Sequence, residues 1–276
     1  MLLAFDIGNT NIVIGVFRND RLVADWRIAS DRQKTHDEYG LLVQQLFQCS
    51  NLKREDVKDI IISSVVPNLT DVVKRTCEQY FNLAPLVVGN GLKTGMPIRY
   101  DNPKEVGADR IVNAVAAIEE YGAPLIILDF GTATTFCVVN EKGEYLGGAI
   151  APGVGISLNA LVERTAQLPK VEMVVPEKVI GKTTVHAIQS GLLYGYCGLV
   201  DGMVRRIAAE LNLPLTDVNV IATGGLAELI HANSETIQKV DQMLTLKGLR
   251  ILYNRNEKLH NKEQKQEEKN VEKGDI

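Results

Sequence analysis

The first residues of the chain combine a carboxylate with small polar residues. Asp6 follows the apolar run 2–5 and precedes a turn of four such residues, Gly8, Asn9, Thr10 and Asn11. Two apolar runs joined by Asn and Gly, which tolerate a left-handed backbone, predict a β-hairpin. Backbone N–H groups in such a loop suit an anion, and a carboxylate suits Mg²⁺. The stretch therefore indicates a phosphate and metal site, although an ordinary hairpin with an aspartate near its tip fits the same residues.

The same pattern occurs again near the middle of the chain. Residues 2–8 (LLAFDIG) align with residues 125–131 (LIILDFG), an offset of 123 residues (125 − 2). Asp129 takes the place of Asp6, and small polar residues follow, Thr132, Ala133, Thr134 and Thr135. This repeat predicts two related α/β halves. Each half would offer an aspartate-bearing hairpin to a shared nucleotide cleft.

A third group of polar residues, Gly107 to Arg110, opens a predicted helix. Helix N-termini attract anions, Arg110 could pair with a substrate carboxylate, and Asp109 could accept a hydroxyl proton. Alternatively, Asp109 only stabilises the helix dipole, by ~0.3–1 kcal/mol, and that dipole would lower its basicity. Phosphoryl transfer needs little early proton abstraction, so positioning could outweigh basicity. Both interpretations of Asp109 stay open at this point.

Glycines at the end of another predicted strand could let a ligand lie against the backbone. Thr223, Gly224 and Gly225 follow the apolar run 218–222, and a nucleoside or an ordinary turn would fit them equally. The sequence contains neither GxxxxGK[ST] nor GxGxxG, so a P-loop and a dinucleotide fingerprint are excluded.

Hydrophobic patterning predicts the elements that must position these residues. We expect further strands at 12–17, 21–28, 59–66, 85–88, 136–139 and 218–222. We expect helices at 36–49, 71–80, 106–121, 156–165, 183–211 and 226–231. We expect irregular chain at 91–102, a glycine-rich loop at 147–155 and an extended loop at 168–180. Glycines within 183–211 predict close packing against another helix.

Composition excludes several classes of partner. The 276 residues carry a net charge of −4 and no basic patch, so we expect neither nucleic acid nor an anionic membrane as a partner. Four widely spaced cysteines favour reduced thiols over disulfides or zinc. No run approaches the ~20 apolar residues of a membrane span, and the N-terminus lacks signal-peptide features, so we expect a cytoplasmic protein. The charged segment 257–276 is expected to be a disordered tail or a solvated, frayed helix.

Together, five ordered motifs resemble the type III pantothenate kinase family, within the acetate kinase, sugar kinase, chaperone and actin superfamily. The resemblance extends from residue 1 to about 256 and departs at none of the functional positions. The motifs are DIGNTN at 6–11, GADR at 107–110, DFGTATT at 129–135, GGAIAPG at 147–153 and TGGLA at 223–227.

This resemblance implies an α/β fold of two tandem ribonuclease H-like (actin-like ATPase) domains, 1–118 and 119–256, with a nucleotide cleft between them, in a homodimer. It implies phosphorylation of pantothenate by ATP, the first step towards coenzyme A. The ATP-binding residues would be Asp6, Ile7, Gly8, Asn9, Thr10, Asn11, Ile12, Val13 and Thr132. Pantothenate would be bound by Tyr100, Gly107, Ala108, Asp109, Arg110 and Thr184.

The resemblance also implies individual roles. Asp109 would be the proton acceptor, Asp6 would serve Mg²⁺, and Asp129 would bind a monovalent cation, K⁺ or NH₄⁺. Arg110 would hold the carboxylate of pantothenate, and Thr184 would reach pantothenate across the dimer interface. Two other classes are an actin-like or chaperone ATPase, which would give the Asp109–Arg110 pair no substrate, and a catalytically silent accessory protein, against which the intact aspartates count.

Overall fold

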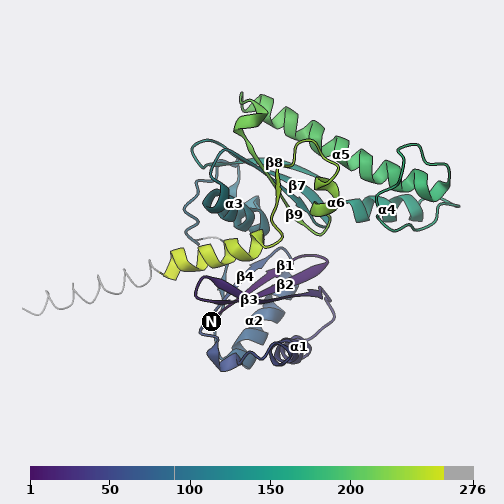
Figure 1. Ribbon diagram of the computed structural model, residues 1–276. Helices are drawn as coiled ribbons and strands as arrows, with labels where there is room; N and C mark the ends of the chain where they lie inside the picture. Colours follow the sequence, from purple (N-terminus) through teal and green to yellow (C-terminus); the bar gives the residue numbers. More distant parts are fainter. Residues whose placement is uncertain (90, 258–276) are drawn as a thin grey trace, which may run out of the picture. The chain divides into compact units, whose positions relative to one another are not determined.

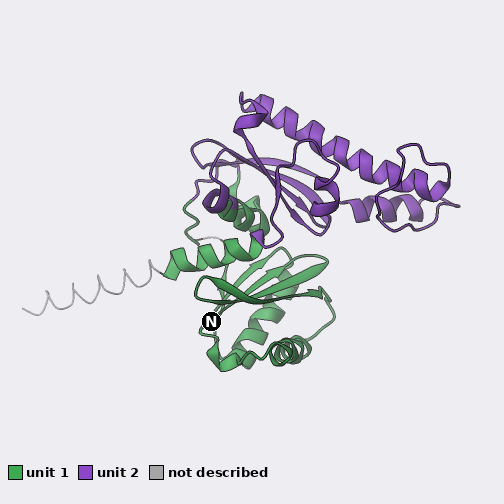
Figure 2. Cartoon of the chain, viewed as in Figure 1, with its two compact units in different colours: residues 1–95, 102–116, 245–276 green, residues 96–101, 117–244 purple. Residues whose placement is uncertain are grey.

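The computed structural model describes residues 1–89 and 91–257. Figure 2 shows two compact units: unit 1 takes the described residues of 1–95, 102–116 and 245–276, and unit 2 takes 96–101 and 117–244. The expected domain ranges, 1–118 and 119–256, stay a prediction. Of the charged tail, only residue 257 is described, and it is helical, as are residues 244–256; residues 258–276 lie outside the described residues.

Unit 1 is built on a mixed five-stranded sheet of order β3-β2-β1-β4-β5. Its strands are β1 (Leu2–Ile7), β2 (Asn11–Arg18), β3 (Arg21–Ala29), β4 (Asp59–Ser64) and β5 (Leu86–Val87). Its helices are α1 (His36–Cys49), α2 (Pro67–Phe81), the 3₁₀ turns η1 (Arg54–Asp56) and η2 (Pro103–Glu105), the first part of α3 (Ala108–Tyr121), and most of the helix over 244–257. β1 runs antiparallel to β2 and parallel to β4, so the carboxyl ends of β1 and β4 lie at one edge.

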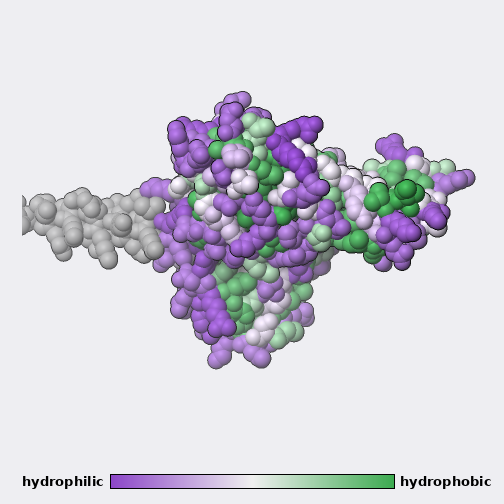
Figure 3. All heavy atoms as spheres, turned by 45° about the horizontal axis from the view of Figure 1, so that its top comes forward, coloured by the Kyte–Doolittle hydropathy of each residue, from purple (hydrophilic) through white to green (hydrophobic). Residues whose placement is uncertain are grey.

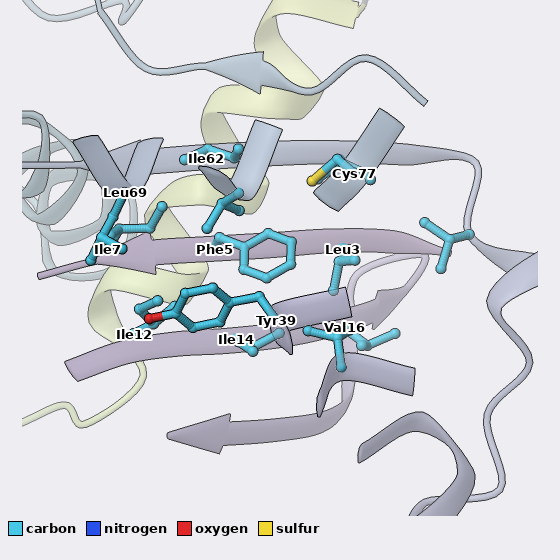
Figure 4. Packing of buried hydrophobic residues seen from close by; sticks show 14 of the residues in the cluster. Leu3, Phe5, Ile7, Ile12, Ile14, Val16, Tyr39, Ile62, Leu69 and Cys77 are labelled. Atoms are coloured by element: carbon cyan, nitrogen blue, oxygen red, sulfur yellow. The ribbon is translucent and has the colours of Figure 1, made fainter. Parts of the chain in front are cut away.

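Alternation along β1 separates the core of unit 1 from its polar edge. Leu3, Phe5 and Ile7 lie in the same apolar layer as Tyr39 of α1 and Leu69 of α2 (Figures 1 and 4). Because successive strand residues point to opposite faces, Asp6 faces away from this layer. The apolar core therefore fixes the strand that presents Asp6.

The opposite face of the unit 1 sheet packs against the helix over residues 244–257. A Cβ added at Gly15 of β2 would lie 2.9 Å from a methyl carbon of Leu246. The same helix contacts α3, because Thr245 Oγ1 donates to Asn113 Oδ1 at 2.7 Å and a Cβ at Gly248 would lie 2.2 Å from the Val112 carbonyl oxygen. This helix therefore holds α3 against the sheet within unit 1.

Unit 2 repeats the strand topology of unit 1. Its sheet has the order β10-β9-β6-β7-β8, with β6 antiparallel to β7 and parallel to β9. The strands are β6 (Leu125–Phe130), β7 (Ala133–Val139), β8 (Tyr145–Pro152), β9 (Asn219–Gly224) and β10 (Lys239–Val240). The helices are α4 (Val154–Glu163), α5 (Thr184–Glu210), η3 (Leu215–Asp217) and α6 (Ala227–His231). The predicted pair of related α/β halves is confirmed, since both sheets share this strand order and these strand directions.

Three local predictions were wrong. Residues 145–152 form strand β8 instead of a glycine-rich loop, because a Cβ at Gly148 would lie 1.6 Å from the Phe136 carbonyl oxygen and only glycine lets the strands pair there. No residue of 8–11 has a positive φ, so the first hairpin does not use a left-handed turn. Helix α2 begins at Pro67, at its first position, instead of at residue 71.

All four cysteines are free thiols, and all except Cys49 are buried. Within residues 1–89 and 91–257, no helix is long and apolar enough to cross a membrane.

Candidate functional site

Asp6 is the last polar residue of β1 before the first loop, and it is partly exposed. It lies in register with Val13 of β2 and Ser63 of β4. The predicted ligands Ile7 and Ile12 flank the loop, but both are at most 1% exposed and their side chains belong to the apolar core. A nucleotide could therefore meet these two residues only through their backbone.

Backbone and side-chain bonds fix the loop after Asp6. The N–H of Gly8 donates to the Asn11 carbonyl at 3.0 Å, so this donor is already used inside the loop. From the end of β3, Ser30 Oγ donates to the Gly8 carbonyl at 2.6 Å and Ser30 N donates to the Thr10 carbonyl at 2.9 Å. Arg32 Nη2 donates to Asn9 Oδ1 at 3.0 Å and brings a cation to the loop.

Ser30 and Arg32 were missed by sequence reasoning. The sequence signal for them was the Ser-Asp-Arg run directly after β3, where the antiparallel hairpins return the chain to the end of β1. A cation that contacts a loop expected to hold phosphate adds to the anion-binding character of that loop.

The second part of the site in unit 1 is the first turn of α3. The Gly107 carbonyl accepts hydrogen bonds from Arg110 N at 3.1 Å and Ile111 N at 3.2 Å, which starts the helix. Asp109 Oδ1 accepts from Arg110 N at 2.8 Å. A Cβ at Gly107 would lie 2.5 Å from the same oxygen, so only glycine leaves room for this carboxylate orientation.

Burial changes the acidity of Asp109. Loss of solvent raises the pKa of its carboxyl above the ordinary value, and the hydrogen bond and charge of Arg110 only partly offset this. The sequence left open whether the helix dipole lowers the basicity of Asp109; burial is the largest influence on this carboxyl, and it raises the pKa. Arg110 itself is 7% exposed, whereas Asp109 is partly exposed.

Unit 1 brings the Asp6 loop and the start of α3 to the same edge of its sheet. Ser63 pairs with Asp6, and two residues later a methyl carbon of Val65 lies 3.6 Å from the Cβ position of Gly107. The end of β4 therefore runs from the Asp6 side of the site to the Asp109 side. This arrangement could hold a phosphate donor and a hydroxyl acceptor as neighbours.

In unit 2, Asp129 occupies the position of Asp6 in the repeated sheet. It lies at the end of β6, in register with Thr135 and Thr223. Its Oδ1 is 2.6 Å from the Cβ position of Gly224, which has φ +94°, so the glycine leaves the space beside the carboxylate open. Thr132 is exposed in the loop that follows, and its carbonyl accepts from Gly153 N at 3.1 Å.

Tyr100 belongs to a segment of unit 2 that is attached to β8. The Tyr145 carbonyl accepts from Arg99 N at 2.8 Å, and Arg99 binds Glu144 through Nε at 3.0 Å and Nη2 at 2.6 Å. The Tyr100 ring lies 3.1 Å from the Cβ position of Gly147, whose φ is +121°. Sequence reasoning missed the contact between Arg99 and Glu144, because the two residues are 45 positions apart in the sequence.

Thr184 is the first residue of α5 and is exposed. Thr183 caps the helix by accepting from His186 N at 3.2 Å. Several large apolar side chains in α4, at the start of α5 and in the segment between them are exposed: Ile156, Val174, Val175, Val179, Ile180 and Val185. Figure 3 shows apolar surface on one face of the molecule.

A clustered metal site is not found among the residues that the structure describes, because no group of three or more His, Cys, Asp or Glu could hold an ion. Single carboxylates at strand ends fit a different kind of site. Mg²⁺ in phosphoryl-transfer enzymes is usually held by one or two carboxylates, water and the substrate phosphates.

Solved structures share this fold at low sequence identity. A conserved Campylobacter jejuni protein of the Baf family of transcriptional activators matches with a TM-score of 0.57 and 17% identity, over 93% of this chain and 99% of that one. A reductive activator for a corrinoid, iron-sulfur protein matches with a TM-score of 0.53 and 13% identity, over 95% of this chain and 61% of that one. With the two repeated sheets, these matches confirm the predicted pair of ribonuclease H-like domains.

Sequence relatives are much closer. The chain is 58% identical to a type III pantothenate kinase of Geotalea uraniireducens, over 93% of this chain and 99% of the relative. It is 56% identical to a type III pantothenate kinase of Geobacter sulfurreducens over the same shares. The family model described as type III pantothenate kinase matches residues 2–206. The chain therefore belongs to the type III pantothenate kinase family.

Proposed function

We propose that this chain transfers the γ-phosphate of ATP to the primary hydroxyl of pantothenate and forms 4′-phosphopantothenate, the first step of coenzyme A biosynthesis. The hydroxyl oxygen forms a bond to the γ-phosphorus while the bond from that phosphorus to the leaving oxygen of ADP breaks. The hydroxyl proton passes to Asp109. The observation that carries the proposal is the Asp109–Arg110 pair at the start of α3, in a member of this family.

Membership in a kinase family implies the use of ATP. In the proposal, Asp6 to Val13 and Thr132 bind the nucleotide, and the loop held by Ser30 and Arg32 lies against its phosphates. This assignment is supported by the position of Asp6 at the carboxyl end of β1. It is also supported by the positively charged guanidinium of Arg32, which donates a hydrogen bond to Asn9. Mg²⁺ would be held by Asp6 and would neutralise phosphate charge.

Pantothenate would be bound by Tyr100, Gly107, Ala108 and Arg110. Its carboxylate is the partner proposed for the Arg110 guanidinium, because a fork of N–H donors matches two carboxylate oxygens. The raised pKa of Asp109 supports its role as proton acceptor, since a base works best with a pKa nearer to the working pH.

A monovalent cation, K⁺ or NH₄⁺, is proposed to bind at Asp129. The support is chemical: a carboxylate lies beside the backbone of Gly224 without a side chain between them. A cation there would offset negative charge on the phosphates.

We further propose a homodimer in which Thr184 contacts the pantothenate of the partner subunit. The exposed apolar side chains around α4 and the start of α5 support this, because large exposed apolar patches mark interaction surfaces. A cytoplasmic location and the absence of nucleic-acid or membrane partners stay predictions.

The test is ADP formation from ATP by the purified full chain, with and without pantothenate and with K⁺ or Na⁺. ADP formation should require pantothenate and should rise when K⁺ replaces Na⁺. Pantothenate-independent ADP formation would contradict the assignment, and equal rates in Na⁺ and K⁺ would remove only the cation site.

A further inference from the structure

Ser63 of β4 carries a buried hydroxyl that the proposed mechanism does not use. The residue is 0% exposed, and among the residues that the structure describes its Oγ has no hydrogen-bond partner. A buried polar group without a partner costs about 1–3 kcal/mol. A serine retained at such a position needs an explanation, because alanine would fill nearly the same space without that cost.

The register of the sheet places Ser63 beside Asp6. The two residues are paired across the parallel strands β1 and β4, so their side chains lie on the same face of the sheet. On the other side of β4, the N–H of Val88 binds the Ile62 carbonyl at 2.8 Å, which puts an apolar residue next to Ser63. Of these two strand neighbours, only Asp6 has a polar side chain. The Ser63 hydroxyl, which has no hydrogen-bond partner, therefore lies beside Asp6, on the same face of the sheet.

The same juxtaposition occurs in unit 2. Thr223 of β9 lies in register with Asp129 of β6, and it is 3% exposed. Both halves of the duplicated fold therefore place a buried hydroxyl beside the aspartate that ends the first strand. The residue before each, Ile62 or Ala222, belongs to the apolar core of its unit, so the two hydroxyl side chains lie on the face away from that core, with the aspartates.

We propose that Ser63 is a further metal-site residue: its Oγ shares with Asp6 the hydrogen bonds to the water shell of the Mg²⁺ that accompanies the nucleotide. This rests on the proposed function. Mg²⁺ gives up its waters reluctantly, so a site needs oxygen atoms that accept hydrogen bonds from those waters. A hydroxyl oxygen next to a carboxylate supplies such an acceptor. Ser63 would then gain its missing partner when the metal-bound nucleotide is present.

The experiment compares ADP binding to the full chain with Mg²⁺ and with EDTA, by calorimetry. In the unaltered protein, Mg²⁺ should strengthen ADP binding. In Ser63→Ala, the factor by which Mg²⁺ strengthens ADP binding should be about three- to tenfold smaller, which is the range for one hydrogen bond. The variant should bind ADP normally in EDTA. Its thermal unfolding midpoint without ligand should be unchanged or higher, because the variant removes a buried hydroxyl that has no partner.

Two further variants separate hydrogen bonding from packing. Ser63→Cys keeps a side chain of similar size with a poor hydrogen-bonding atom, and it should behave like Ser63→Ala. Ser64→Ala is the matched control: the adjacent hydroxyl binds Val66 N at 3.1 Å and Thr70 Oγ1 at 2.7 Å, in the turn into α2. This control should leave the difference between Mg²⁺ and EDTA unchanged.

Three results would overturn the proposal. One is a Ser63→Ala variant that keeps the full Mg²⁺ effect, and another is an equal loss of affinity with and without the metal. The third is an unaltered protein whose ADP binding ignores Mg²⁺, which would also remove the metal from the proposed function. None of these readouts uses pantothenate, so a failure of the substrate assignment would be seen separately.

Discussion

At the scale of single residues, Asp109 combines burial with a hydrogen bond from its own helix. Desolvation raises the pKa of this carboxyl, while Arg110 N and the guanidinium charge favour the ionised form. A proton acceptor needs this compromise: ionised before the reaction, yet more basic than an exposed aspartate. The structure thus gives a reason for the order Gly-Ala-Asp-Arg, since Gly107 makes room for the carboxylate that Arg110 N holds.

We expect Asp109→Asn to lower kcat by at least about 100-fold and to leave ADP affinity unchanged. In the unaltered enzyme, kcat should fall as the pH is lowered, and the apparent pKa of this fall should lie above the ordinary aspartate value of about 3.9, because burial raises the pKa of Asp109. A steady-state pH profile and ADP titrations check this. The control is Asp101→Asn, at an exposed aspartate nearby in sequence. Near-normal turnover would remove Asp109 from the base role.

The same variant makes a prediction about stability. A carboxyl whose pKa is raised by folding binds its proton more tightly in the folded state, so it favours folding at low pH and opposes folding as pH rises through the folded-state pKa. Asp109→Asn should therefore unfold at the same or a higher temperature than the unaltered chain at pH 7–8. Below about pH 3.9 this advantage should disappear.

At the scale of elements, hydrophobic patterning predicted the positions of helices and strands where the local sequence controls them. Helix α1 was predicted at 36–49 and begins there because Thr35 and Glu38 form a capping box. β4 was predicted from its β-branched run, and only its last two residues differ. The repeat at 125–131 also predicted the place of Asp129, because the repeated residues include the strand and its aspartate.

Patterning failed where distant contacts control the structure. Gly147 and Gly148 resemble loop residues, but β8 needs glycine at position 148 to approach β7, and the sequence alone does not show this contact. The two-residue strand β10 is too short to show alternation. Ser63 was visible as part of a strand, but its partner across the sheet, Asp6, is known only from the register.

The attachment of residues 96–101 to β8 shows how an element positions a predicted substrate residue. Hydrogen bonds from Asn140 and Arg99 hold the pKa of Glu144 below its usual range, so it stays ionised and keeps Arg99 in place. We expect Glu144→Gln to raise the KM for pantothenate about two- to fivefold, because Tyr100 loses part of its support. The KM for ATP and kcat should not change.

Steady-state kinetics with each substrate varied in turn check this prediction. The matched control is Glu235→Gln, which weakens the Arg205–Glu235 ion pair elsewhere in unit 2. If both variants behave alike, or if Glu144→Gln changes the KM of both substrates equally, the segment does not act through Tyr100.

At the scale of the whole molecule, the chain carries apolar surface that the described residues leave open. Ile180 is 82% exposed and Val179 is 64% exposed, next to the capped start of α5 where Thr184 lies. Covering such side chains stabilises an assembly by about 25 cal/mol for each Å² of apolar area removed from water. A second copy that covers this surface would also bring a second Thr184 with it.

We therefore expect Ile180→Glu to convert a dimer into a monomer, because a carboxylate in a covered apolar surface would lose its solvation. If Thr184 serves the partner subunit, the monomer should bind ADP normally and lose at least about tenfold in pantothenate affinity. Sedimentation and calorimetry check the two parts. Leu41→Glu, at a 56% exposed apolar residue of α1, is the control and should change neither. A monomer with unchanged pantothenate binding would show that each chain completes its own substrate site.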